Sequence, residues 1–371
     1  MPTRDRARAG TRNTCCVSAR IRPDLDTIPR YVPGKSYPGA IKLASNETTL
    51  GPLPSVAKAV AEAVELSNRY PDNRSTELIA ALAARHGVNA ANVTVGCGSV
   101  ALCQELAQIT CFEPTDEVLY AWRAFEMYPI VAQVAGATSV RVPLDTAETH
   151  DLAAMAHAVT DRTRLIYVCN PNNPTGTAVD GAELNRFVEQ VPDDVLVVLD
   201  EAYFEYNRTG VDGIEIAKQH SNVLVLRTFS KAYGLAGLRV GYAVGAPHVI
   251  EALAKVHVPF SVSRVAQAAA LASIEAQHEL LERTDKIVAE RARVRTALLD
   301  AGYRVPTTEA NFVWLPLGSE SARFGDNSAE AGVIVRPYGN DGVRVTIGDP
   351  HENDAFLAFA LAPDTVAQFA V

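Results

Sequence analysis

Four short segments of the sequence place reactive side chains directly after apolar runs. They are Gly96 to Ala101, Asn170 to Gly176, Asp200 to Tyr203, and Thr228 to Gly241. Their groups could bind a phosphate, aim an amide, supply a carboxylate and supply an amine nucleophile. Short apolar runs are typical of buried strands, and ligands of open parallel sheets bind at the carboxyl ends of the strands. We therefore expect the four segments to meet at one site.

The first segment, Gly96-Cys97-Gly98-Ser99-Val100-Ala101, has the composition of a phosphate site. Glycines let the backbone approach an anion, and the helix that follows offers unpaired N–H groups at its positive end. The segment also matches the dinucleotide fingerprint G-x-G-x-x-A, which needs an acidic residue at the end of the next strand, whereas Asp116 and Glu117 precede that strand. An NAD-dependent oxidoreductase would leave Lys231 and Asp200 without a role. A turn that binds nothing is the other alternative.

The next two segments hold side chains that need partners. In Asn170-Pro171-Asn172-Asn173-Pro174-Thr175-Gly176, the two prolines and Gly176 predict a rigid loop that aims the Asn173 amide. Asp200 lies at the mouth of a buried strand, where a carboxylate is costly unless it meets a cation or a hydrogen-bond donor. Capping a helix is the alternative role for Asp200.

The fourth segment holds Lys231 beside hydroxyl groups, followed by glycines and Arg239. Taken alone, such a segment could be a solvent-exposed surface segment without a function. Together with the other three segments, it predicts a lysine that forms a Schiff base next to a phosphate clamp.

Composition narrows the partners. The chain has 371 residues, a net charge of -9 and 21% charged residues. An acidic chain argues against nucleic acid as the main partner, so an anionic substrate must meet a few placed arginines. There is no run of about 18 apolar residues that could span a membrane. The six cysteines form no C-x-x-C pair and have no histidine at zinc-finger spacing, so we expect no metal and the reduced thiols of a cytoplasmic protein.

The elements that must position these residues are predicted from periodicity. Apolar strands alternate with helices such as Glu77 to His86 and Leu184 to Gln190, which indicates an α/β fold with a mainly parallel sheet covered on both sides. After about residue 262, a long helix from Gln277 to Ala301 precedes further strands, which indicates a smaller α+β domain. The predicted strands are Val93 to Val95, Val118 to Tyr120, Leu165 to Val168, Val195 to Leu199, Val223 to Leu226, Arg239 to Val244, Asn311 to Leu315, Val333 to Arg336 and Val343 to Ile347.

Three regions follow from these patterns. Residues 1–22 contain six arginines against one acid and no apolar core of a secretory signal, so we expect a disordered extension, with an organellar transit peptide as the alternative. Residues 50–270 are expected to form the large domain. Residues 23–49 and 271–371 are expected to form an N-terminal arm and a small C-terminal domain.

The ordered set Asn173-Pro-Thr-Gly, Asp200-x-x-Tyr203, Ser230-Lys231 and Arg239 resembles the class I/II aminotransferases of fold type I, which use pyridoxal 5'-phosphate. The resemblance covers about residues 25 to 360 and implies a seven-stranded sheet sandwiched by helices. Within the family, the chain is similar to histidinol-phosphate aminotransferases and to the aromatic (phenylalanine) aminotransferases of actinobacteria. The segments that carry this similarity are Ile28 to Lys35, Leu43 to Glu47, Arg69 to Asp72 and Val343 to Gly348.

The resemblance implies a role for each residue. Lys231 would bind the cofactor and move a proton, Asp200 would keep the pyridine nitrogen protonated, and Tyr203 would act with Asn173 on the phenolic oxygen. The remaining cofactor-binding residues would be Gly98, Ser99, Val100, Ser230, Arg239 and Thr228 around the phosphate, Phe125 against the ring, and Tyr70 from a partner subunit, which implies a homodimer. The substrate would meet Arg344 at its α-carboxylate, with Asn46, Tyr31 and Arg336 around it.

The implied reaction is a ping-pong transfer of an amino group from phenylalanine, tyrosine or tryptophan to a 2-oxo acid such as 2-oxoglutarate. Histidinol-phosphate enzymes usually carry an acidic residue in the phosphate turn, whereas this chain has Gly98-Ser99-Val100. The segments Trp122 to Glu126 and Asn311 to Leu315 also resemble the aromatic branch. A histidinol-phosphate aminotransferase, a phosphothreonine-type decarboxylase and a binding protein on the same fold remain alternatives, and Lys231 argues against the last.

Overall fold

The computed structural model describes residues 19, 21–28 and 38–370, and the chain divides into two units, residues 1–31 and 32–371. In the first unit, the described residues form one 3-10 helix, η1 (Pro23–Thr27), beside the Arg22–Asp24 ion pair. Tyr31 and most of the basic extension over residues 1–22 lie outside the described residues.

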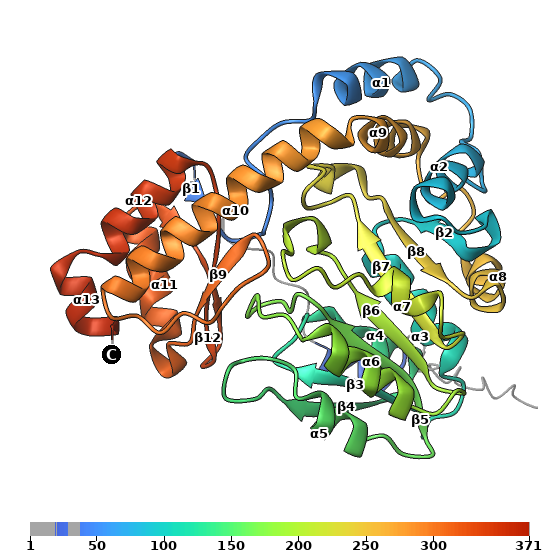
Figure 1. Ribbon diagram of the computed structural model, residues 1–371, viewed down its shortest axis with the longest axis horizontal. Coiled ribbons are helices and arrows are strands. Elements are labelled where there is room, and N and C mark those ends of the chain that lie inside the picture. Colours follow the sequence, from blue (N-terminus) through green and yellow to red (C-terminus); the bar gives the residue numbers. More distant parts are fainter. Residues whose placement is uncertain (1–18, 20, 29–37, 371) are drawn as a thin grey trace, which may run out of the picture. The chain divides into compact units, whose positions relative to one another are not determined.

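The second unit contains a seven-stranded sheet with the strand order β2-β8-β7-β6-β5-β3-β4 (Figure 1). Strand β8 runs antiparallel to both of its neighbours, and the other neighbouring strands are parallel. The predicted α/β class with a mainly parallel seven-stranded sheet is therefore confirmed. The strands are β2 (Val93–Gly96), β3 (Glu117–Trp122), β4 (Thr138–Pro143), β5 (Thr163–Cys169), β6 (Leu196–Asp200), β7 (Val223–Thr228) and β8 (Gly241–Gly245).

Helices cover both faces of this sheet. Val197 and Leu199 of β6 enter one hydrophobic cluster, whereas Leu196 and Val198 enter another. Because alternate residues are buried on opposite faces, the strands read as continuous apolar runs. One cluster includes residues of α2 (Thr76–His86), α5 (Leu152–His157), α6 (Gly181–Gln190) and α7 (Gly213–Ala217), and the other includes residues of α3 (Ser99–Thr110), α4 (Met127–Ala135) and α8 (Pro247–Val256).

A second group of elements follows the large sheet in the chain. The long helix α10 (Gln277–Asp300) extends from α9 to this group (Figure 1). Its antiparallel sheet has the order β11-β12-β9, and a short parallel pair joins β1 to β10. Helix α1 (Pro54–Val64) packs on α9 (Arg264–Glu275). The remaining strands are β1 (Ile41–Lys42), β9 (Phe312–Leu315), β10 (Val333–Ile334), β11 (Arg336–Tyr338) and β12 (Gly342–Thr346). The remaining helices are α11 (Ser321–Glu330), α12 (Pro350–Ala360) and α13 (Pro363–Phe369), with the 3-10 helices η2 (Ala90–Asn92), η3 (Phe204–Tyr206), η4 (Ala236–Leu238) and η5 (Gly318–Glu320).

Three strand predictions need correction. The strand expected from Arg239 begins at Gly241, because Arg239 has a φ of 58°, in the left-handed region that a strand cannot contain. The strand expected over residues 333–336 is divided into β10 and β11, which belong to different sheets. Strand β4 was not predicted, because it lies at the sheet edge and its exposed Thr138 and Arg141 interrupt the apolar pattern.

Among the described residues, no helix combines the length and the apolar character needed to cross a membrane. They also contain no group of three or more histidine, cysteine, aspartate or glutamate side chains that could hold a metal ion.

Candidate active site

Asp200 ends β6 and forms the buried floor of the site. Oδ2 accepts a hydrogen bond of 2.7 Å from the Tyr128 hydroxyl, whereas Oδ1 is buried without a hydrogen-bond partner among the described residues. Burial raises the pKa of Asp200 to about 6, and the Tyr128 hydrogen bond opposes that rise. A buried, unpaired carboxylate oxygen needs a donor, and the protonated pyridine nitrogen of pyridoxal 5'-phosphate would supply one.

Lys231 lies just after β7, close to the carboxyl end of the sheet. Its Nζ donates a hydrogen bond of 3.3 Å to the Ser45 carbonyl and lies 5.9 Å from the centre of the Tyr203 ring. Burial, together with the positive charges of Arg344 and Arg239, lowers the pKa of Lys231 to about 8. A substantial fraction of this amine is therefore neutral, as a nucleophile or a base must be.

The phosphate turn has the geometry of a cradle. Gly98 has a φ of 76° and precedes α3, and a Cβ on Gly98 would collide with the guanidinium of Arg239. A Cβ on Gly241 would come within 2.6 Å of the Ser99 backbone nitrogen. Both positions therefore need glycine, and together they bring Arg239 to the N-terminus of α3.

Hydroxyl groups complete this cradle. Arg239 Nη1 donates to Ser230 Oγ at 3.2 Å, and the Ser230 backbone N–H donates to Thr228 Oγ1 at 3.1 Å. Val100, the second residue of α3, is half-buried at the same turn. The structure thus brings together all six residues predicted around a phosphate, and the group fits the donors that they present.

Two asparagines of the predicted site make hydrogen bonds to other site residues. Asn173 Oδ1 accepts a bond of 2.6 Å from Arg344 Nη1, and Asn46 Nδ2 donates to the Tyr203 hydroxyl at 2.9 Å. The Thr346 hydroxyl donates to Asn46 Oδ1 at 3.0 Å. In this arrangement Asn173 orients the arginine, while Asn46 orients the tyrosine.

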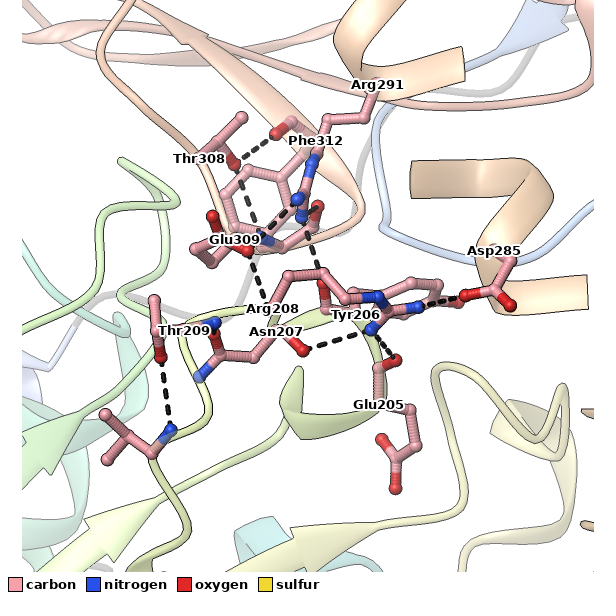
Figure 2. A network of polar contacts seen from close by, with 12 residues as sticks. Glu205, Tyr206, Asn207, Arg208, Thr209, Asp285, Arg291, Thr308, Glu309 and Phe312 are labelled. Atoms are coloured by element: carbon pink, nitrogen blue, oxygen red, sulfur yellow. Dashed lines mark hydrogen bonds and ion pairs between the residues drawn. The ribbon is translucent and has the colours of Figure 1, made fainter. Parts of the chain in front are cut away.

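A polar network surrounds the segment from Glu205 to Thr209, which follows Tyr203 in the chain (Figure 2). Arg291 of α10 donates through Nη1 to the carbonyls of Tyr206 and Ala310, both at 3.1 Å. Phe312, at the start of β9, meets the Tyr203 ring edge to face with centroids 5.0 Å apart. The network therefore joins η3, which follows Tyr203, to the segment that leads into Phe312.

Arg344 is held at the site by three hydrogen bonds. It is 6% exposed, and it donates to Tyr338 Oη at 2.7 Å and to the Ala44 carbonyl at 2.8 Å, in addition to Asn173. Its Nε is buried without a partner among the described residues. The printed bonds use three of the five N–H groups of the guanidinium, so the Nε–H and one Nη2–H remain for a carboxylate.

Phe125 and Arg336 each adjoin a site residue described above. Phe125 meets the Tyr128 ring edge to face at 5.6 Å, which places it next to the Asp200 floor. Arg336 on β11 is directly opposite Arg344 on β12.

Two further site residues were predicted, Tyr70 from a partner subunit and Tyr31. Tyr70 is 77% exposed and stacks on Phe260 at 4.5 Å, between α1 and α2. Tyr31 lies outside the described residues.

The prediction missed two residues of the site, Tyr128 and Tyr338. Tyr128 follows Phe125 by three residues, a spacing that shares one face of a helical turn. Tyr338 follows Arg336 by two residues, a spacing that shares one face of a strand. Each tyrosine lies two positions beyond a segment that the sequence analysis had singled out, Trp122 to Glu126 and Val333 to Arg336.

Comparisons with known proteins agree with this geometry. Residues 38–359 match the family model of aminotransferase class I and II. The chain is 68% identical to an aromatic amino acid aminotransferase of Nocardia farcinica, over 95% of this chain and 100% of the relative, and 66% identical to one of Rhodococcus jostii, over 94% and 97%. Among solved structures, the histidinol-phosphate aminotransferase of Sinorhizobium meliloti in complex with pyridoxal 5'-phosphate has a TM-score of 0.86 and 29% identity, covering 95% of this chain and 99% of that chain. The chain belongs to the class I and II aminotransferases.

Proposed function

We propose that this protein transfers the amino group of an aromatic amino acid to a 2-oxo acid such as 2-oxoglutarate, with pyridoxal 5'-phosphate as its cofactor. The observation that carries the chemistry is the convergence of Lys231, the unpaired Asp200 oxygen and the Arg239 cradle at one edge of the sheet. The aromatic substrate class rests on the relatives at 66% and 68% identity.

When bound, pyridoxal 5'-phosphate supplies an electron sink that stabilises negative charge at the substrate's Cα. Asp200 Oδ1 would accept a hydrogen bond from the protonated pyridine nitrogen, while Tyr128 holds the other carboxylate oxygen. Lys231 would hold the cofactor covalently and, once the substrate's amino group has displaced it, would take the proton from Cα as a neutral amine. Tyr203 and Asn173 complete the surroundings of the phenolic oxygen.

The substrate's α-carboxylate would bind Arg344 through the Nε–H and the second Nη2–H, because both Nη1 hydrogens and one Nη2 hydrogen already have partners. A planar guanidinium held on both sides selects a carboxylate in one orientation. Asn46, which is held by hydrogen bonds to Tyr203 and Thr346, is proposed to lie beside the bound carboxylate. Arg336, opposite Arg344 on the small sheet, is the proposed contact for the substrate's side chain, and Tyr31 is proposed for the same role from the family resemblance alone.

The working form is a cytoplasmic homodimer that binds neither nucleic acid nor membranes. Exposed Tyr70 and Phe260 form a stacked apolar pair, and Phe260 holds a φ of 59°, which is strained for a bulky residue. Arg264 and Asn73 fix the pair through its backbone. Such a preorganised apolar surface supports a subunit interface, across which Tyr70 reaches the partner's cofactor phosphate.

We also propose the domain division. The cofactor domain spans residues 50–270. Residues 23–49 and 271–371 form the arm and the small domain, and residues 1–22 form a basic extension.

The test compares kcat/KM for phenylalanine, tyrosine and histidinol phosphate with 2-oxoglutarate as the shared acceptor. We expect the two aromatic amino acids to be preferred. Two arginines share one face of the small sheet, so a histidinol phosphate substrate is the second candidate, and its clear preference would reverse the assignment. Lys231→Ala is the inactive control.

A further inference from the structure

Two arginines with different surroundings lie side by side at the proposed substrate pocket. Arg336 and Arg344 are directly opposite in the antiparallel register of β11 and β12, so their side chains share one face of the sheet. Both guanidiniums also pack on the Tyr338 ring, at 5.6 Å and 5.4 Å from its centre. A second cation therefore stands beside the one that receives the α-carboxylate.

The two arginines have partners of different charge. Arg344 is held by the neutral groups of Asn173, Tyr338 and Ala44. Arg336 instead forms an ion pair of 3.2 Å between its Nη2 and Glu126 Oε2. Glu126 directly follows Phe125 at the start of α4, so its carboxylate comes from the segment that would stack on the cofactor.

A second ion pair joins the same two segments. Arg123 Nη2 lies 2.6 Å from Asp341 Oδ2, and its guanidinium packs on Trp122 and on Tyr338. Three arginines and two carboxylates thus meet at this end of the pocket, which leaves one uncompensated positive charge among these five side chains. That charge matches a substrate with one carboxylate.

We propose that Glu126 is a selectivity residue, which holds Arg336 in an ion pair and thereby disfavours substrates that carry a phosphate. This rests on the proposed function, in which Arg344 binds the α-carboxylate. A phosphate monoester that approached Arg336 would be repelled by the Glu126 carboxylate and would have to replace it. An aromatic ring carries no charge, so the Glu126 carboxylate does not repel it and the ring needs no ionic partner. Since the two side chains are only 18% and 33% exposed, solvent weakens this contrast only in part.

The experiment measures kcat/KM for histidinol phosphate and phenylalanine in the holoenzyme and in Glu126→Gln and Glu126→Ala. We expect the ratio of histidinol phosphate to phenylalanine to rise about tenfold in both variants, mainly through a lower KM for the phosphate substrate. Inorganic phosphate should also inhibit phenylalanine turnover at lower concentrations than in the wild type. Glu126→Asp keeps the carboxylate and should keep the ratio nearer the wild-type value.

Two further variants separate the ion pair from general charge effects. Glu251→Gln removes one negative charge from an exposed pair with Lys255 on α8, away from the site residues, and should leave activity and ratio unchanged. In an Arg336→Gln background, Glu126→Gln should no longer raise the ratio, because the cation that it releases is absent.

The outcomes distinguish this inference from the proposed function. An unchanged ratio in both Glu126→Gln and Glu126→Ala, or a rise that persists without Arg336, overturns the role of Glu126 while aromatic turnover stands. A wild type that prefers histidinol phosphate overturns both.

Discussion

The Tyr128 hydroxyl donates a 2.7 Å hydrogen bond to Oδ2 of Asp200, and Oδ1 of the same carboxylate has no partner among the described residues. A donor to one oxygen stabilises the charged carboxylate against the cost of burial. It also fixes which oxygen faces the cofactor. Tyr128 is therefore a positioning residue for Asp200.

Tyr128→Phe should lower the affinity for pyridoxal 5'-phosphate. Without the hydrogen bond, the pKa of Asp200 rises above about 6, so less of the carboxylate is ionised at neutral pH. We expect about a tenfold higher Kd at pH 7, of the order of 1.5 kcal/mol, and a larger effect at pH 6 than at pH 8. Absorbance titration of the apoprotein measures this.

Tyr167→Phe is the matched control. The Tyr167 ring stacks on Tyr128 at 4.5 Å, but its hydroxyl donates to the Cys103 carbonyl rather than to Asp200. If both variants lost the same affinity with the same pH dependence, the positioning role of Tyr128 would be wrong.

Asp200→Asn should stabilise the apoprotein while disabling the enzyme. Burial raises the pKa of Asp200 from 3.8 to about 6, so the folded state binds this proton more tightly than the unfolded state. The resulting stability is present below about pH 4 and is lost as the pH rises through about 6. Asparagine removes this loss, so the variant should be more stable at pH 7.5, by up to about 3 kcal/mol.

Urea unfolding of both apoproteins at pH 4.5 and pH 7.5 checks the sign. The advantage of Asp200→Asn should shrink at the lower pH, and an advantage that does not change with pH would contradict the buried-charge explanation. Cofactor affinity and turnover should fall by orders of magnitude, since the amide cannot hold the charged pyridine nitrogen as a carboxylate does.

Covalent attachment of the cofactor should follow the ionisation of Lys231. With a pKa of about 8, the neutral amine becomes dominant between pH 7 and pH 9, so the attachment rate should rise across that range. Arg344→Gln removes a neighbouring positive charge, so the rise should move to higher pH. Stopped-flow absorbance after adding pyridoxal 5'-phosphate to apoprotein gives both profiles.

Lys231→Ala should show no absorbance change from covalent attachment, no yellow covalent complex and no turnover. Substantial turnover in that variant would exclude the amine as the attachment point. An unshifted profile in Arg344→Gln would instead mean that burial alone lowers the pKa of Lys231.

Arg344→Met should remove the recognition of the α-carboxylate. Its unpaired Nε and its anchored neighbours make it the group placed to bind that anion. We expect kcat/KM for phenylalanine to fall about a thousandfold, or about 4 kcal/mol, while 2-phenylethylamine, which lacks the carboxylate, should be little affected. Arg344→Lys should not restore the activity, because an ammonium cannot form the planar fork.

The sequence predicted the fold class because buried strands appear as continuous apolar runs, which is a local signal. It predicted the phosphate turn for a similar reason, because glycine at positions 98 and 241 reflects close backbone approach. It missed β4, whose edge position removes the apolar pattern, and it did not place Arg239 outside the strand, because the left-handed turn at a non-glycine residue has no reliable sequence signal.

The pairing of side chains could not be predicted in the same way. Asn173 and Arg344 are 171 positions apart in the chain, and Asn46 and Tyr203 are 157 apart. Spacing within a segment says which face a residue occupies, but contacts between segments depend on the register of strands that are distant in the chain. The bonds from Asn173 to Arg344 and from Asn46 to Tyr203 are therefore visible only in three dimensions.

Tyr70 provides a test of the proposed homodimer. Tyr70→Phe keeps the ring that stacks on Phe260 but removes the hydroxyl that would reach the partner's cofactor phosphate. We expect the variant to remain a dimer and to bind pyridoxal 5'-phosphate about tenfold more weakly. Phe260→Asp places a charge in the apolar surface and should produce monomers in sedimentation analysis, whereas Phe112→Asp, which changes another exposed aromatic residue, should not.

Mixed dimers separate a shared site from a site within one subunit. A Lys231→Ala subunit lacks the amine but supplies Tyr70, and a Tyr70→Phe subunit supplies the amine but lacks the hydroxyl. If the site is composite, a mixed dimer holds one complete site, so refolding the two variants together should give more activity at limiting cofactor than Tyr70→Phe alone. If Tyr70 served its own subunit, no complete site would form, and mixing would only dilute the activity of the Tyr70→Phe protein.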